Sequence, residues 1–343
     1  MNTGPDNPRA AKEHGNRLET GADSSRFTFH SSRITFHVSR FDWSSLVGTG
    51  ATASAAFLIL AILAVILSNV VIEGLPHVSW RLLSTGTATD MFDPQKAGIL
   101  PMVFGTAARV MIMTILVLPA GVLTAIYLTE YARINSPLTR IIRGAVNNLA
   151  GVPSIVFGLF GLGFFVHFAG HAMDSTLYAG KSANIWGQPG LLWASATLAV
   201  MTLPVVIVAT EESLRAIPQG LREASLALGA TKLETIVRMV LPQAIPGIMT
   251  GAILATSRAA GEVAPILFTG VAYYMADLPR SLHDQFMDLG YHVFILSTQS
   301  PNVDKTKPLL YATVLVLLVL TFTLNIVAII VRANMRRKLR MLQ

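Results

Sequence analysis

The sequence predicts an all-α membrane protein with six transmembrane helices. Hydrophobic residues make up 52% of the chain and charged residues only 13%, a balance too apolar for a soluble protein that must cover its surface with polar side chains. The apolar residues gather in six long segments, and the basic residues collect between and beyond those segments. We therefore expect the lipid bilayer to be the solvent of most of this chain.

Length and composition locate the six segments. An α-helix rises 1.5 Å per residue, so about 20 apolar residues cross a hydrocarbon core of about 30 Å. The qualifying segments are 51–72, 104–129, 150–169, 191–209, 244–273 and 309–331. The fifth is longer than a crossing needs and contains several helix-interrupting residues, namely Pro246, Gly247, Gly261, Pro265 and Gly270. We expect it to begin before the membrane and to be kinked or broken within it.

The N-terminal region differs in composition from the rest. Residues 1–45 are rich in Ser and Arg and lack the apolar content that would offset the entropy of ordering, so we expect a disordered tail. The first apolar segment begins near residue 46 and is too long for the hydrophobic region of a signal peptide. It should remain as a signal anchor, and residues 46–343 should form the transmembrane domain.

The distribution of basic residues predicts the orientation. Lysine and arginine are concentrated at both ends of the chain and in the connections after the second and fourth segments, whereas the connection after the third holds only Lys181. Cytoplasmic loops of membrane proteins carry an excess of these residues, so both termini should be cytoplasmic. The connections 73–100 and 274–308 would then lie outside, where they could receive a soluble partner.

Several chemistries lack the residues that they require. The chain has no cysteine, which excludes disulfides and thiolate metal sites, and no pair of histidines four residues apart flanks a glutamate. No GxxxxGK[ST] motif occurs, so the chain should not hydrolyse ATP or hold a cofactor of its own. Basic residues do not form a stripe with interleaved aromatics, which argues against nucleic acid as a partner. The chain shows no repeated halves, which disfavours the alternative of a secondary transporter.

The connection after the fourth segment begins with consistent helix signals. Pro218 suits the start of a helix, and Leu221, Ala224 and Leu228 follow at helical spacing. Gly229 is placed to end that helix in the left-handed conformation.

A second short helix is expected directly afterwards. Thr231 and Glu234, three residues apart, have the pattern of a capping box. One apolar face should follow until Pro242 interrupts it, formed by Leu233, Ile236, Val237 and Val240. A rigid helix–turn–helix at the cytoplasmic surface could receive a push from a soluble motor. An amphipathic helix without a partner is the alternative.

The same region resembles the EAA loop of ABC importer permeases, here over residues 211–246. The resemblance rests on Glu223-Ala224-Ser225, then Gly229, then Leu241-Pro242, although Ser225 stands where a second alanine is usual. It implies the type I ABC importer permease fold and a short helix that docks in a groove of a separate ATPase, which binds the ATP. The implied coupling residues are Glu223, Ala224, Gly229, Leu241 and Pro242.

Two charges lie inside the fifth segment. Arg258 and Glu262 are four residues apart and should share one helix face. A charge at membrane depth costs at least about 3 kcal/mol, so both should face the bundle interior, a partner or a watery pathway. The pair is either a structural ion pair or part of an anion pathway, since the planar arginine fork matches oxyanions. Arg109, near the end of the second segment, is expected to snorkel to lipid headgroups.

Three stretches together resemble the PstA-type permease subunits of phosphate-specific ABC importers. They are SRAAGEVAPILFTG (257–270), NNLAGVPSIVFGLFGLGFF (147–165) and IPQGLREASLALGATK (217–232), and the resemblance extends from about residue 46 to the C-terminus. It implies a bacterial inner-membrane protein in which Arg258 and Glu262 take part in phosphate movement. It also implies a PstC-type permease in a heterodimer, a PstB-type ATPase dimer and a PstS-type phosphate-binding protein.

The choice of phosphate rests on that resemblance alone, because the residues themselves indicate only an anion. The sister PstC-type subunit and a sulfate or molybdate permease remain alternatives. A homodimer also remains open as an alternative to the heterodimer.

Overall fold

The computed structural model describes residues 43–87, 91–133, 135–178, 184–275 and 277–340. The chain divides into two compact units, Met1–Leu58 and Ile59–Gln343. In the first unit, the described residues form the beginning of helix α1 (Trp43–Gly74). The tail predicted to be disordered, residues 1–45, lies outside the described residues except for residues 43–45, which belong to α1.

Six helical stretches in the described residues are long and apolar enough to cross a membrane, which confirms the predicted number and the all-α class. They are Val47–His77, Leu100–Tyr131, Ser154–Leu177, Leu191–Arg215, Lys232–Gly261 and Val303–Met335. Each overlaps the segment predicted for it.

Three of these stretches, the second, third and fifth, combine α-helical and wider π-helical turns. The second joins α3 (Leu100–Ile126) to a π-helical turn (Tyr127–Tyr131). The third consists of α5 (Ser154–Gly161), a π-helical run (Leu162–Gly170) and α6 (His171–Leu177). The fourth is α7 (Leu191–Arg215), and the fifth joins α9 (Lys232–Thr235), a π-helical turn (Ile236–Val240) and α10 (Leu241–Gly261). The sixth lies within α12 (Val303–Arg340).

Short elements connect the spanning stretches. They are 3₁₀ turns at Leu75–His77 and Ala264–Ile266, α2 (Trp80–Ser84), α4 (Pro137–Leu149), α8 (Gln219–Ala227) and α11 (Leu289–Thr298).

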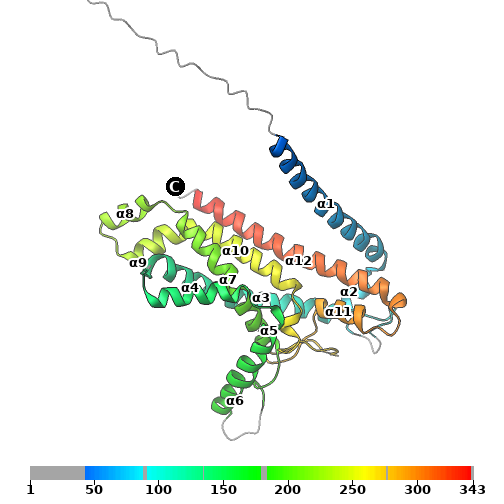
Figure 1. Ribbon diagram of the computed structural model, residues 1–343. Helices are drawn as coiled ribbons and strands as arrows, with labels where there is room; N and C mark the ends of the chain where they lie inside the picture. The colour runs from blue at the N-terminus through cyan, green and yellow to red at the C-terminus, as the bar shows by residue number, and fades with distance from the viewer. Residues whose placement is uncertain (1–42, 88–90, 134, 179–183, 276, 341–343) are drawn as a thin grey trace, which may run out of the picture. The chain divides into compact units, whose positions relative to one another are not determined.

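Helix α7 is the central packing element of the second unit. It packs against α3, α10 and α5, and the buried cluster around it includes Met113, Val206 and Ala259. Helix α10 approaches α7 closely, because Gly251 leaves room for the side chain of Ala209. Figure 1 shows α12 running alongside α10, and α11 also packs against α12.

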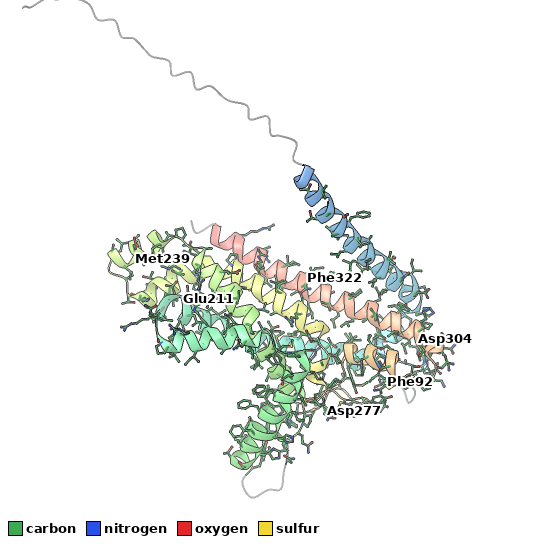
Figure 2. All side chains as sticks on the ribbon, viewed as in Figure 1. Phe92, Glu211, Met239, Asp277, Asp304 and Phe322 are labelled. Atoms are coloured by element: carbon green, nitrogen blue, oxygen red, sulfur yellow. The ribbon has the colours of Figure 1, made fainter. Side chains whose placement is uncertain are left out.

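The second unit has two distinct ends. Figure 2 places Glu211 and Met239 toward one end and Phe92 and Asp304 toward the opposite end. Helices α8 and α9 lie at the first of these (Figure 1), which we call the elbow end. The opposite end is called the far end.

The predicted end of the fifth segment at residue 273 was wrong, but its predicted break is present, because α10 ends at Gly261 and Glu262 has extended backbone (φ −82°, ψ 125°). Pro265 accounts for this end, since its ring would clash with the carbonyl of the residue four positions earlier. Pro242 does not interrupt the helix. The amide of Leu241 donates to the carbonyl of Ile236, five residues earlier, in the π-helical turn. This wider turn accommodates Pro242 in the first turn of α10.

The loop after α10 returns to the start of α7. The first amides of a helix have no partner within it, and here residues 262–288 supply two carbonyls. Leu191 donates to Asp284 at 2.9 Å, and Leu192 donates to Leu282 at 2.8 Å. The loop is therefore held to the helical bundle by backbone hydrogen bonds.

Gly105 provides a test of this packing. A Cβ on Gly105 of α3 would clash with the backbone oxygen of Met287, so Gly105→Ala must displace the loop. We expect a lower thermal midpoint of unfolding, because overpacking costs about 1–3 kcal/mol. The control is Gly144→Ala in α4, where no atom lies within 4 Å; it should keep or raise the midpoint, since alanine favours helix by about 1 kcal/mol. Equal midpoints for Gly105→Ala and the unaltered protein, measured in detergent, would contradict the packing.

Candidate functional site

The helix–turn–helix predicted from sequence is present, and we call residues 218–242 the elbow. Pro218 precedes α8, and Gly229 has φ +87°, the left-handed conformation that its position predicted. At the start of α9, Thr231 accepts from the amide of Glu234 at 3.3 Å, while the amide of Thr231 donates to the Glu234 carboxylate at 3.0 Å. The capping box is therefore confirmed. Ser225, where the EAA pattern usually has alanine, bonds Thr235 at 2.9 Å and so joins the two elbow helices.

The apolar residues of the elbow divide between two surfaces. Ile236 and Val240 are buried in a cluster with Leu214, as a core-facing helix requires. Other large apolar residues of the elbow are exposed, and we call four of them the exposed patch: Leu226, Leu228, Leu233 and Val237. The single apolar face predicted for the second helix was therefore wrong, because the π-helical turn changes the register between its ends.

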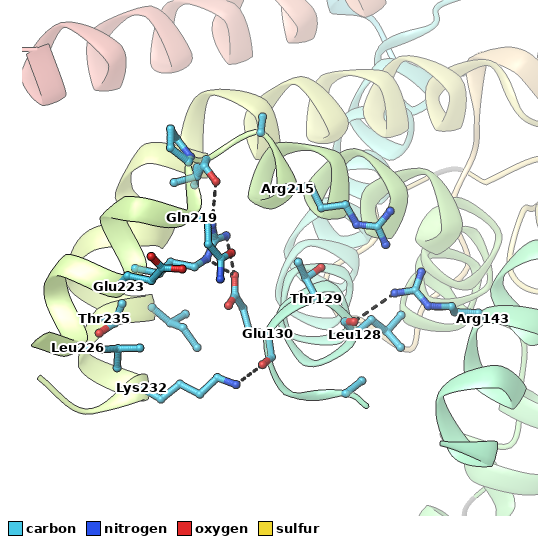
Figure 3. A pocket seen from close by; sticks show the side chains of 16 residues that line it. Leu128, Thr129, Glu130, Arg143, Arg215, Gln219, Glu223, Leu226, Lys232 and Thr235 are labelled. Atoms are coloured by element: carbon cyan, nitrogen blue, oxygen red, sulfur yellow. Dashed lines mark hydrogen bonds and ion pairs between the residues drawn. The ribbon is translucent and has the colours of Figure 1, made fainter. Parts of the chain in front are cut away.

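Two cations fasten the elbow to the end of the second spanning stretch. Arg222 of α8 donates to the Glu130 carboxylate at 2.8 and 3.2 Å, and the two side chains are 13% and 9% exposed. Arg222 also donates to the carbonyls of Leu214 and Ile217, both at 2.8 Å. Lys232 of α9 donates to the backbone oxygen of Glu130 (Figure 3). No local pattern marks Glu130 in the sequence, because its partners lie about 90 residues or more away along the chain.

A groove of about 780 Å³ lies between the elbow and the ends of the second and fourth spanning stretches (Figure 3). Its charged lining residues are Glu130, Arg143, Arg215, Arg222, Glu223 and Lys232. Arg143 and Arg215 both donate to Glu211, each at 2.9 Å. The groove is therefore predominantly basic.

The structure places the five predicted coupling residues on different sides of the elbow. Glu223 and Ala224 lie on α8 and are exposed, and Gly229 is exposed in the turn beside the apolar patch. Leu241 and Pro242 are partly buried, and Leu241 packs against the cluster beneath the elbow.

Arg258 and Glu262 are brought together at the end of α10. Their Nε and Oε1 atoms are 3.4 Å apart, and the side chains are 53% and 23% exposed. Arg258 lies in the last helical turn, whereas Glu262 follows the helix, so the expectation of one shared helix face was wrong. The contact persists because the Glu262 side chain reaches back to Arg258.

Arg109 does not snorkel to the surface, and that prediction was wrong. Its side chain is fully buried and lies 2.7 Å from the carboxylate of Asp288. It also donates to the carbonyls of Ala259 at 3.0 Å, Ala260 at 3.3 Å and Glu262 at 3.2 Å. The last carbonyls of a helix have no partner within it. Arg109 therefore caps α10 beside the Arg258–Glu262 pair.

Asp288 is held from several directions. Its Oδ1 accepts from the amide of Tyr291, which caps the start of α11, and its Oδ2 lies 2.9 Å from the hydroxyl of Thr106. The same hydroxyl accepts from the amide of Leu289. Asp288 is only 1% exposed, so Arg109 supplies the opposite charge that a buried carboxylate requires.

His292 is a second buried ionisable group, located in α11. Neither of its ring nitrogens has a hydrogen-bond partner among the described residues. Burial lowers the pKa of His292 from 6.5 to about 4, because the interior penalises the charged imidazolium. The unfolded chain binds this proton near pH 6.5 and the folded chain only near pH 4. Folded stability therefore falls as the pH drops through that window.

Residues 117–341 match the family of binding-protein-dependent transport system inner membrane components. Phosphate transport system permease protein PstA 1 of Mycobacterium tuberculosis is 32% identical over 244 residues, covering 71% of this chain and 72% of that protein. PstA of Yersinia pestis is 32% identical over 276 residues, covering 76% and 85%. Phosphate transport system permease protein PstC of Mesorhizobium japonicum is 32% identical over 244 residues, covering 67% and 72%.

A solved structure shares the fold. The chain is similar, with a TM-score of 0.57, to a chain in the crystal structure of a bacterial alginate ABC transporter in complex with a periplasmic protein. The match covers 86% of this chain and 96% of that chain at 12% identity. At this identity the similarity concerns the fold alone.

His292 gives a pH-dependent prediction. Replacing it by leucine removes the buried group that must remain uncharged, so His292→Leu should lose less stability on acidification than the unaltered protein. The difference should reach up to about 3 kcal/mol near pH 4. The measurement is the drop in thermal midpoint of the detergent-solubilised protein between neutral pH and about pH 4.5. Equal drops in the two proteins would show that His292 does not contribute.

Proposed function

The chain belongs to the family of binding-protein-dependent transport system inner membrane components, and on that premise we propose that it is a permease subunit of an ATP-driven phosphate importer. It forms half of the translocation pathway, and a second permease forms the other half. Relatives named as PstA phosphate permeases support the substrate. The observation in the chain that carries the proposal is Arg258, 53% exposed on a helix that is apolar and long enough to span the membrane.

The chemistry of Arg258 suits an oxyanion. Only its Nε contacts Glu262, and no hydrogen bond to its terminal nitrogens Nη1 and Nη2 occurs within the described chain. These two nitrogens form a planar fork that can bind two oxygens of one phosphate. A charge facing lipid would cost at least about 3 kcal/mol, so the face that carries Arg258 lies against the second permease.

The elbow supplies the contact with the motor. We propose that the exposed patch of Leu226, Leu228, Leu233 and Val237 docks on a PstB-type ATPase, which binds and hydrolyses the ATP. An apolar patch on a charged cytoplasmic loop is typical of an interaction surface. The elbow end and both termini then face the cytoplasm, and a PstS-type protein delivers phosphate at the far end.

A sister PstC-type subunit is the second candidate, because a relative of that name also matches. A permease for sulfate or molybdate would have the same fold and would differ only in the anion that it transports. Uptake of phosphate in the presence of sulfate and molybdate separates these substrates.

Neutralising Arg258 and Glu262 tests the pathway. If the two are only a structural pair, then replacing both by neutral residues should largely restore uptake that either single change impairs. We instead expect Arg258→Gln and the double variant Arg258→Gln/Glu262→Gln to lose most phosphate uptake while the complex still assembles. Arg258→Lys should also transport poorly, because an ammonium cannot reproduce the two-pronged contact. The measurement is uptake per assembled complex in the membrane. Near-normal uptake in the double variant would remove Arg258 from the pathway.

Gly229 tests the elbow as the docking element. Gly229→Val forces a β-branched residue into the left-handed region, at a cost of roughly 1 kcal/mol or more, and should misalign the two elbow helices. Uptake and stimulated ATP hydrolysis should both fall while the permease still inserts. Gly229→Asn should retain more activity, since asparagine tolerates this conformation.

The matched control is Gly220→Val, which adds the same side chain to the same elbow. A Cβ added at Gly220, like one added at Gly229, would meet no atom within 4 Å, but Gly220 lies in α8 and has no positive φ. It should transport normally. If Gly229→Val transports as well as Gly220→Val, the docking geometry does not depend on the elbow turn.

A further inference from the structure

The second and fifth spanning stretches are fastened to each other toward both ends. At the elbow end, Lys232 at the start of the fifth spanning stretch donates to the backbone oxygen of Glu130. Toward the far end, Arg109 of α3 donates to the carbonyls of Ala259 and Ala260 of α10. Glu130 and Arg109 are 21 residues apart, which corresponds to about 30 Å along a helix.

The tie at the elbow end includes the first elbow helix. Arg222 of α8 pairs with the Glu130 carboxylate, and Lys232 of α9 lies 4.9 Å from the ring centre of Tyr131. The π-helical turn that carries Glu130 and Tyr131 therefore contacts both helices of the elbow. If the elbow moves, this end of the second spanning stretch must either move with it or hold it back.

Neither the second nor the fifth spanning stretch is uniformly stiff. The fifth spanning stretch contains a π-helical turn (Ile236–Val240), Pro242 and Pro246, while the second contains Pro119 and its own π-helical turn (Tyr127–Tyr131). Prolines and π-helical turns interrupt the backbone hydrogen-bond ladder and are the usual sites of helix bending. Because the two stretches are fastened to each other toward both ends, neither can bend at its prolines or π-helical turn unless the other bends with it.

We infer that the second spanning stretch braces the fifth, so that Glu130–Arg222 and Arg109–Asp288 act in series to carry elbow motion to the Arg258–Glu262 pair. The inference deepens the proposed function and rests on it. Arg109 reaches the pair because it holds the carbonyl of Glu262 as well as those of Ala259 and Ala260. The four residues are positioning residues, since none of them is required to touch the transported anion.

The test uses the complete transporter in proteoliposomes and measures phosphate moved per ATP hydrolysed. Glu130→Gln loosens the elbow tie while leaving the backbone oxygen that Lys232 uses. Arg109→Met/Asp288→Asn removes both buried charges together, which avoids an uncompensated charge, and asparagine still caps α11. Each change should lower the ratio about fivefold or more, the scale of a typical coupling between sites.

The combination of the two changes distinguishes a series linkage from independent effects. If both ties belong to one brace, then breaking the second after the first should lower the ratio little further. Independent effects would multiply to about 25-fold. An unchanged ratio in the single changes, or a multiplied loss in the combination, would overturn the inference.

Asp174→Asn controls for lost stability alone. Asp174 is a nearly buried carboxylate that accepts from the amides of Trp186 and Gly187, remote in sequence from both ties. Its replacement should lower the thermal midpoint without changing the ratio. If Arg109→Met/Asp288→Asn does not assemble, then Thr106→Val, which removes only the hydroxyl that contacts Asp288, is measured in its place and must lower the ratio.

The failure of this inference is distinguishable from failure of the proposed function. If the unaltered complex moves no phosphate in these proteoliposomes, the proposed substrate is wrong. If the unaltered complex moves phosphate and the changes at Glu130 and at Arg109 and Asp288 leave the phosphate moved per ATP unchanged, only the brace is wrong.

Discussion

The buried ion pair between Arg109 and Asp288 organises the part of the structure on which the candidate pathway depends. A guanidinium in a low-dielectric interior is costly unless its charge is paired and most of its donors are satisfied. Asp288 pairs the charge, and three carbonyls around the end of α10 accept from the terminal nitrogens, while the Nε of Arg109 has no partner among the described residues. Arg109 therefore fastens the end of α10 to the carboxylate that caps the start of α11.

Burial and hydrogen bonding distinguish the two arginines near the end of α10. The terminal nitrogens of Arg109 are not available to an anion, because they are occupied by Asp288 and by backbone oxygens. Arg258 contacts Glu262 through Nε at 3.4 Å and is half-exposed, so its terminal fork is available. The proposed division is that Arg109 positions the site and Arg258 binds the oxyanion. Both are arginines in spanning stretches, and only their surroundings distinguish them.

Much of the elbow could be predicted because its signals are local. Pro218, Gly229 and the Thr231–Glu234 box each act within a few residues, through backbone preferences and caps that hardly depend on the rest of the fold. The predictions that failed concern the second elbow helix, where a π-helical turn takes the place of the expected α-helical turn. Pro242 was expected to stop the helix, but the π-helical turn before it removes the clash. The apolar residues of the second elbow helix then divided between the core and the exposed patch.

The membrane class, the six spanning stretches and the shape of the elbow could be predicted from the residues alone, because hydrophobic length and capping are properties of short segments. Arg258 and Glu262 could be singled out in the same way, since charges in an apolar segment are conspicuous. The contacts of Arg109, Asp288 and Glu130 became apparent only in the folded chain. Arg109 and Asp288 are 179 residues apart, and Glu130 and Arg222 are 92 apart. No local pattern encodes such a pair, because its partners meet only after the helices have packed and excluded water between them.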